Sequence, residues 1–120
     1  MSLGSDWAIN SAPVAATQAT ASKAAQAGFR HKCTGFSLGI DAVAAQGDIV
    51  FNLRDGATGA GTILWSMRLS AAAGTSRDIT VAGLSIGGSG NTAMTLETVG
   101  APAATNFAYV NLTGATEPAA

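Results

Sequence analysis

The sequence of 120 residues is short of cysteine, of charge and of aromatic side chains. Cys33 is the only cysteine, so no disulfide can form within the chain, and an oxidising, exported setting is not indicated. Charged residues make up 11% of the chain, and the largest basic cluster is the pair Arg30 and Lys32. Nucleic-acid phosphates are usually bound by a broad basic stripe, so we expect no nucleic-acid partner.

Long apolar runs are missing as well. No stretch approaches the roughly 18 apolar residues that a membrane-spanning segment needs. The first residues also lack the basic region and apolar run of an export signal. We therefore expect no membrane partner.

The sequence is rich in alanine instead. Hydrophobic residues reach 48%, but 26 of the 120 residues are alanine and only 6% are aromatic. One domain is expected at this length. Its core should be thin, because burial stabilises by roughly 25 cal/mol per Å² and alanine offers little area. Burial between subunits would add stability, so the composition favours a homo-oligomer.

The clearest structural pattern lies in residues 47–70. Every second residue from Ile63 to Leu69 is large and apolar, and residues 48–54 alternate in the same way. The connection between them begins at Asp55-Gly56 and ends at Gly61, and aspartate and glycine suit the left-handed backbone of tight turns. This stretch predicts an antiparallel hairpin whose inward face includes Ile63.

Similar patterns predict strands near residues 7–10, 18–25, 29–41, 76–82, 92–99 and 107–113, with a short strand or loop at 83–90. Between Cys33 and Phe36 the apolar face changes parity, which predicts a bulge that Gly35 permits. About eight strands without a convincing helix predict an all-β fold, an antiparallel β-sandwich of the jelly-roll type. The expected organisation is an N-terminal segment (1–17), the sandwich (18–114) and a C-terminal tail (115–120).

His31 and Cys33 lie two residues apart on one strand face, where a thiolate–imidazole pair would be chemically useful. Their Cα atoms are expected about 6.6 Å apart, which is loose for a direct hydrogen bond, and no third group is marked to orient them. A buried cysteine and a surface or interface histidine are the simpler interpretation. We assign no catalytic residue and expect no enzymatic activity.

No metal or cofactor site is expected either. Zinc sites usually use several Cys or His ligands, and this chain has one of each, although a symmetric oligomer could gather several copies of His31 at its axis. Asp41, Asp48 and Asp55 recur every seven residues, but they fall at strand ends, where aspartate is a common turn residue. The glycine-rich residues 56–61 match no phosphate-binding motif, and no helix follows them.

Two groups of residues are candidates for contacts with partners. In the last strand Phe107 and Tyr109 have the opposite parity to Ala108 and its apolar neighbours, and Leu64 has the opposite parity to Trp65. Leu64, Phe107 and Tyr109 are therefore candidate interface residues on an outer sheet face, unless the N-terminal segment covers them. The candidate contact loops contain Asp55, Gly56, Gly59, Gly61 and Asn91.

Four segments carry a resemblance to a known family. They are NLRDGATGAGTILWS (52–66), GFRH (28–31), CTGF (33–36) and GNTAMTLE (90–97). Together they resemble a family of small proteins of tailed bacteriophages and prophages, over roughly residues 18–114. The resemblance implies a virion-associated β-sandwich, made in the bacterial cytoplasm and placed among head, tail or fibre components.

These observations lead to one expected function and one alternative. We expect a non-enzymatic virion structural protein that assembles as a homo-oligomer, with a trimer favoured and other virion proteins as partners. The alternative is a carbohydrate-binding adhesion module that binds a host surface glycan through Tyr109, Phe107 or Trp7 as stacking platforms.

Overall fold

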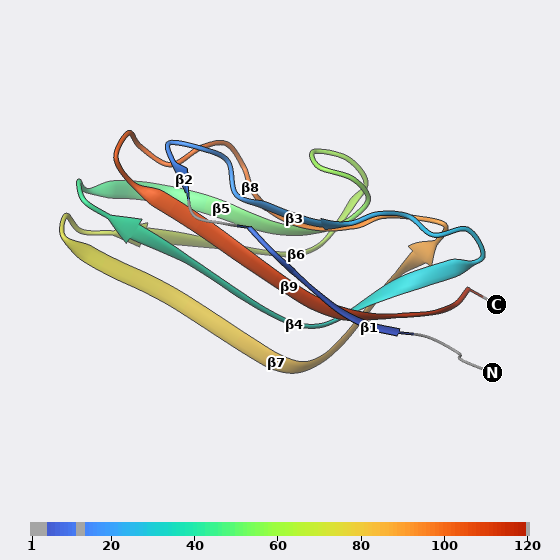
Figure 1. The fold of residues 1–120 in the computed structure, drawn as a ribbon. Coiled ribbons are helices and arrows are strands. Elements are labelled where there is room, and N and C mark those ends of the chain that lie inside the picture. Colours follow the sequence, from blue (N-terminus) through green and yellow to red (C-terminus); the bar gives the residue numbers. More distant parts are fainter. Residues whose placement is uncertain (1–4, 12–13, 120) are drawn as a thin grey trace.

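The computed structural model describes residues 5–11 and 14–119, which form two antiparallel sheets packed face to face (Figure 1). Sheet I contains β1 (Ser5–Asn10), β2 (Val14–Ala15), β4 (Phe29–Ala42), β7 (Thr75–Gly90) and β9 (Phe107–Pro118). Sheet II contains β3 (Thr20–Lys23), β5 (Gln46–Asp55), β6 (Thr62–Ala71) and β8 (Met94–Thr98). The predicted all-β antiparallel sandwich is confirmed.

The strand order mixes early and late parts of the chain. Sheet I has the order β1-β9-β4-β7, with the short β2 also paired to β9, and sheet II has the order β3-β8-β5-β6. All neighbours are antiparallel. The predicted hairpin of residues 47–70 is β5 and β6, and among the eight longer strands it is the one connection that stays within a sheet. No helix in the described ranges is long and apolar enough to cross a membrane.

The core lies between the sheets and consists of side chains from alternate positions of each strand. The large, fully buried members are Leu38 and Ile40 of β4, Phe51 and Leu53 of β5, Met94 and Leu96 of β8, and Val110 and Leu112 of β9. The short β3 contributes only Ala19 (just before it) and Ala21. The core is therefore as thin at β3 as the alanine content predicts.

The predicted bulge in β4 is present. The pairing of β4 with both of its neighbours shifts between Cys33 and Gly35, and both Cys33 and Phe36 point into the core. A Cβ on Gly35 would lie 2.8 Å from the Val81 carbonyl oxygen. Glycine is thus required here by the close approach of the neighbouring strand.

A second bulge, which the sequence does not predict, changes which residues of β6 point toward the core. The β5–β6 pairing shifts between Leu53 and Arg54, so that Ile63 lies opposite Arg54. Ile63 is consequently 48% exposed, and Leu64 packs against the core. The predictions that Ile63 points inward and that Leu64 lies on the outer face are both wrong, because the extra residue reverses the alternation.

The limits of the fold also differ from those expected. β1 pairs with β9 from Ser5↔Thr116 to Asn10↔Asn111, so part of the segment 1–17 belongs to sheet I. At the other end β9 continues to Pro118, and Glu117 forms an ion pair with Arg30 at 2.8 Å. Residues 75–90 form a single long strand in place of a strand followed by a short strand or loop.

Asn106 organises the end of the sandwich that lies opposite the chain termini. Its side chain is fully buried, and its Oδ1 accepts hydrogen bonds from the Val43 and Ala44 amides, while its Nδ2 donates to Ala44 O and to Gln46 Oε1. Four hydrogen bonds saturate the amide. The β4–β5 turn is fixed in this way without a charged side chain.

Candidate functional site

The outer face of sheet I is built from rows of side chains that run across the strands. Residues that pair across neighbouring strands share a face, so the register defines each row. One row holds Tyr109, Gly39 and Asp78, the next holds Asn111, Ser37 and Thr80, and the third holds Thr113, Gly35 and Ala82. We call these the aromatic row, the amide row and the hollow row.

In the aromatic row the ring of Tyr109 lies across Gly39. A Cβ on Gly39 would collide with the phenol, so only glycine lets the ring rest on the backbone. The phenol lies over Gly39 of β4, and Asp78 follows on the next strand of the same row. Burial, together with the negative charges of Asp78 and Asp41, raises the pKa of Tyr109 above its ordinary value. Tyr109 is half-buried on the outer face of the sheet.

The amide row carries neutral hydrogen-bonding groups. Asn111 Nδ2 donates to Ser37 Oγ at 2.9 Å, which fixes the orientation of both side chains. The Asn111 carbonyl oxygen, its second Nδ2 proton and the Ser37 hydroxyl proton then remain without partners among the described residues. Thr80, at the far side of the row, is exposed. β1 extends the row with Asn10, which pairs with Asn111.

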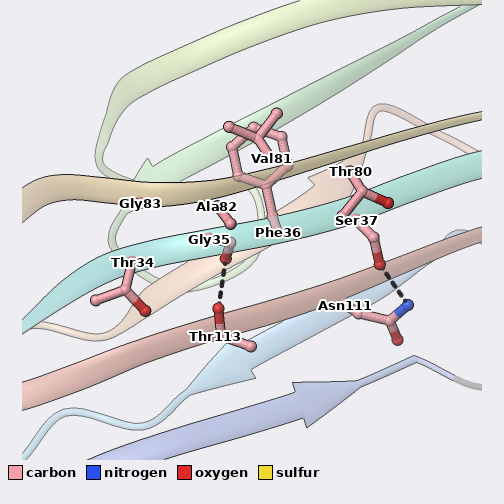
Figure 2. A pocket seen from close by; sticks show the side chains of 10 residues that line it. All are labelled: Thr34, Gly35, Phe36, Ser37, Thr80, Val81, Ala82, Gly83, Asn111 and Thr113. Atoms are coloured by element: carbon pink, nitrogen blue, oxygen red, sulfur yellow. Dashed lines mark hydrogen bonds between the residues drawn. The ribbon is translucent and has the colours of Figure 1, made fainter.

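A hollow of about 490 Å³ opens in this face beside the β4 bulge (Figure 2). Its floor is Gly35, whose carbonyl oxygen accepts a hydrogen bond from Thr113 at 3.0 Å. A second hollow, over β1 and β9, shares Thr34 and Thr113 with the first. The two depressions therefore follow one another across the sheet.

The outer face of sheet II is different, because the β5–β6 loop folds over it. Glu97 of β8 is 2% exposed although it points away from the core. Its carboxylate accepts a hydrogen bond from the Gly59 amide at 2.8 Å and lies 3.5 Å from Arg54 Nε. Thr95, also buried, donates to the Gly56 carbonyl at 2.8 Å. Residues 56–61 thus form a roof over a buried carboxylate.

The candidate contact-loop residues are largely occupied by their own chain. Asp55 accepts hydrogen bonds from Ser89 N and Ser89 Oγ, which ties sheet II to sheet I. Gly56 is buried, and Gly59 donates to Glu97. Gly61 adopts a φ of 81° and lies against Asp55. These four positions therefore have structural roles in the loop.

Asn91 forms the turn between β7 and β8. It has a φ of 56°, and its Oδ1 accepts a hydrogen bond from the Gly28 amide at 2.6 Å. Its own amide donates to the Phe29 carbonyl at 2.8 Å. The exposed side chain thereby links two turns at the end where the chain termini lie.

The interface candidates separate into two groups. Phe107 and Tyr109 are half-buried on the outer face of sheet I, as their parity predicts. Trp7 turns the other way: it packs on Gly114 and the core, with its ring 5.8 Å from that of His31. Trp7 therefore offers no outer-face platform, which corrects that part of the carbohydrate-binding alternative.

His31 and Cys33 do not form a pair. His31 is buried, with Nε2 2.7 Å from the Ala24 carbonyl and Nδ1 2.7 Å from Thr116 Oγ1. Since the carbonyl only accepts, Nε2 carries the proton; Thr116 can then donate to Nδ1 while accepting from Trp7 Nε1 at 3.0 Å. Cys33 is fully buried, and this burial raises the pKa of its thiol. His31 and Cys33 therefore have separate hydrogen-bond partners and do not contact each other as a reactive pair.

The three regularly spaced aspartates lie apart. Asp41 belongs to β4 of sheet I, and Asp48 and Asp55 stand near opposite ends of β5. Among residues 5–11 and 14–119, no three His, Cys, Asp or Glu side chains converge as a metal site would require.

Comparison with known proteins places the chain in no family. No family model and no curated protein matches it. A solved structure of Bacillus endospore appendages, described as a novel family of disulfide-linked pili, aligns with 98% of this chain and 88% of its own. The identity is 17% and the TM-score is 0.34. A TM-score this low carries no information about the fold or function of this protein.

Proposed function

We propose that the protein is a non-enzymatic structural subunit that assembles with further copies of itself. In the setting that the phage-family resemblance implies, it is a virion-associated component of head, tail or fibre. The observation that carries the proposal is the open side of the sandwich between β6 and β7. Both are edge strands, each with one hydrogen-bonded neighbour.

The inner faces of these two edges are only partly covered. Nine hydrophobic residues pack on the core without being buried by it, and all but Trp7 and Ile9 belong to this side: Leu64, Trp65 and Met67 of β6, and Ile79, Val81, Leu84 and Ile86 of β7. Half-exposed apolar side chains beside unpaired strand edges favour contact with another chain. A ring of three copies would cover this side in every subunit.

The sandwich belongs, in this proposal, to the jelly-roll type that virion proteins often use. The support is the topology: among the eight longer strands, every connection except the β5–β6 hairpin crosses from one sheet to the other. In consequence the first and last strands are neighbours, and each sheet interleaves strands that are distant in sequence.

Absolute mass in solution tests the proposal. Light scattering coupled to size exclusion, over a dilution series, should give a stable multiple of 11.8 kDa, with three subunits expected. Met67→Lys places an ammonium on the open side, where a half-buried position lets it reach water. This variant should reduce the mass to that of one subunit.

Ser66→Lys is the matched control, because Ser66 is exposed on the opposite face of the same strand. It should assemble as the unmodified protein does. A monomer at all concentrations would overturn the proposal, as would a Met67→Lys protein that is folded and still assembled.

A further inference from the structure

We propose that the outer face of sheet I is a binding site for a neutral carbohydrate chain. The site consists of the aromatic, amide and hollow rows, with Tyr109, Asn111, Ser37 and Thr80 as the contacting side chains. This function goes beyond the structural role proposed above and uses the opposite face of β7 from the open side.

The aromatic row supplies a stacking platform. The phenol end of Tyr109 packs against the backbone of Gly39 in the row that also holds Asp78, so contacts within the chain restrict the ring before any ligand arrives. Aromatic side chains with one apolar face and a polar tip are well suited to partners that are both apolar and hydrogen-bonding. The C–H face of a sugar ring is such a partner, and fixing the platform beforehand reduces the entropy lost on binding.

The amide row supplies the hydrogen bonds. Once one proton of Asn111 Nδ2 is donated to Ser37, the pair presents one acceptor, Asn111 Oδ1, and two donors, the second Nδ2 proton and the Ser37 hydroxyl. Thr80 adds a hydroxyl that both donates and accepts. Sugar hydroxyls also do both, so every group in the row has a complementary partner on a carbohydrate.

The hollow gives the ligand room at the third row. At about 490 Å³, it falls within the roughly 300–1,000 Å³ range of small-molecule sites. The small residues Gly35 and Ala82 leave the space open between Thr113 and β7. Since rows two residues apart are about 6.6 Å apart along the strands, one extended chain can touch the platform, the amide row and the hollow in turn.

Charge selects a neutral sugar. The amide and hollow rows contain no ionisable side chain, whereas Asp78 and Asp41 lie beside Tyr109. An acidic saccharide placed on the platform would meet two carboxylates at close range and be repelled. A neutral chain avoids this repulsion.

Nuclear magnetic resonance on the ¹⁵N-labelled full chain tests the site directly. The probes are cellohexaose, maltohexaose and chitohexaose, each added to about 5 mM, which detects even millimolar dissociation constants. At least one should shift amide signals mainly within residues 35–39, 78–82 and 109–113. Shifts that map elsewhere, or no shift with all three sugars, would overturn the proposal.

Substitutions separate the contributions. Tyr109→Ala and Asn111→Leu should each weaken binding by about tenfold or more, because one removes the platform and the other leaves sugar hydroxyls unpaired. Tyr109→Phe keeps the ring and should stay within about threefold of the unmodified protein. Thr62→Val, on β6 of the other sheet, is the control and should change nothing.

Equal binding by Asn111→Leu and the unmodified protein would count against the site even if Tyr109→Ala fails to fold. The mass of each variant, measured in parallel, keeps this proposal apart from the assembly proposal. Loss of sugar binding at unchanged mass supports the site alone, and loss of mass with retained sugar binding concerns assembly alone.

Discussion

The two outer faces of this sandwich have similar sequence patterns and opposite surroundings. On sheet I, Thr80 is exposed and Asn111 and Ser37 are half-buried, beside a ring that rests on glycine. On sheet II, Thr95 and Glu97 occupy equivalent outward positions and are buried, because residues 56–61 cover them. Outward-pointing polar residues therefore do not by themselves mark a solvent-exposed face.

The difference assigns different roles to the two faces. A covered carboxylate must be neutralised by neighbours of its own chain, so Glu97, Arg54 and the loop stabilise each other. Uncovered amides and hydroxyls keep hydrogen-bonding capacity for other molecules. The outer face of sheet II, covered by residues 56–61, contributes to the stability of the fold. The outer face of sheet I is the one available for binding another molecule.

The largest expected effect comes from removing the covered carboxylate. Glu97→Ala leaves Arg54, whose side chain is 17% exposed, without its partner, and breaking such a pair costs about 3–5 kcal/mol. The free energy of unfolding from urea titration measures the loss.

Glu117→Ala is the same substitution on the open sheet. Glu117 pairs with Arg30 at 2.8 Å, but the two side chains are 30% and 46% exposed, so the loss should be only about 0.2–1 kcal/mol. Equal losses for the two variants would show that the roof does not shield Glu97.

The next effect concerns the roof itself. Gly61 and Gly28 both have a φ of 81°, and a side chain in that conformation costs roughly 1–2 kcal/mol. At Gly61 the added Cβ would also collide with the Asp55 carbonyl, whereas at Gly28 nothing lies within 4 Å. Gly61→Ala should therefore lower the thermal midpoint more than Gly28→Ala, and similar midpoints would argue against a packed loop.

A smaller effect is expected where Tyr109 rests on the sheet. The Cβ of Gly39→Ala would overlap the phenol and lie 2.6 Å from the Arg77 carbonyl oxygen, an overpacking that typically costs about 1–3 kcal/mol. Gly47→Ala, with open space around it, is the control and should be nearly neutral. A neutral Gly39→Ala would mean that the ring does not lie on the backbone.

The smallest effect is electrostatic. Tyr109 is the only tyrosine in the chain, so phenolate absorbance reports its titration alone. Burial and the two aspartates raise its pKa above 10.0, and Asp78→Asn should lower it. Because the folded pKa is the higher one, the contribution of Tyr109 to stability is complete below pH 10 and is lost as the pH rises through the folded pKa. An unchanged titration in Asp78→Asn would remove Asp78 as a cause.

The sequence predicts the parts of this fold that depend on alternation within one strand. The parity change between Cys33 and Phe36 located the β4 bulge, and the parity of Phe107 and Tyr109 placed them on the outer face. Both follow from the period of two that every strand obeys. The sequence-derived sandwich rests on the same rule.

The features that depend on distant contacts were not predictable. The β6 bulge at Ile63 and Leu64 has no glycine to mark it, and it arises from pairing with β5. The burial of Glu97 requires a loop some 40 residues earlier to fold over β8, as the Gly59 contact, 38 positions away, shows. The packing of Tyr109 on Gly39 likewise depends on the register of β4 and β9, which places these two residues opposite each other. A glycine in a strand was the only signal that could have pointed to a neighbouring aromatic ring.

The central place of β9 in sheet I has a consequence for how the chain is made. Within the described part of the chain β1 pairs only with β9, and the bonded residues Trp7 and Thr116 are 109 positions apart. At about 5–20 residues per second, synthesis leaves β1 without its partner for on the order of 5–20 s. Docking of β1 is thus a late event that waits for β9, and until then the edge of β4 that β9 will occupy is open to pairing with the wrong strand.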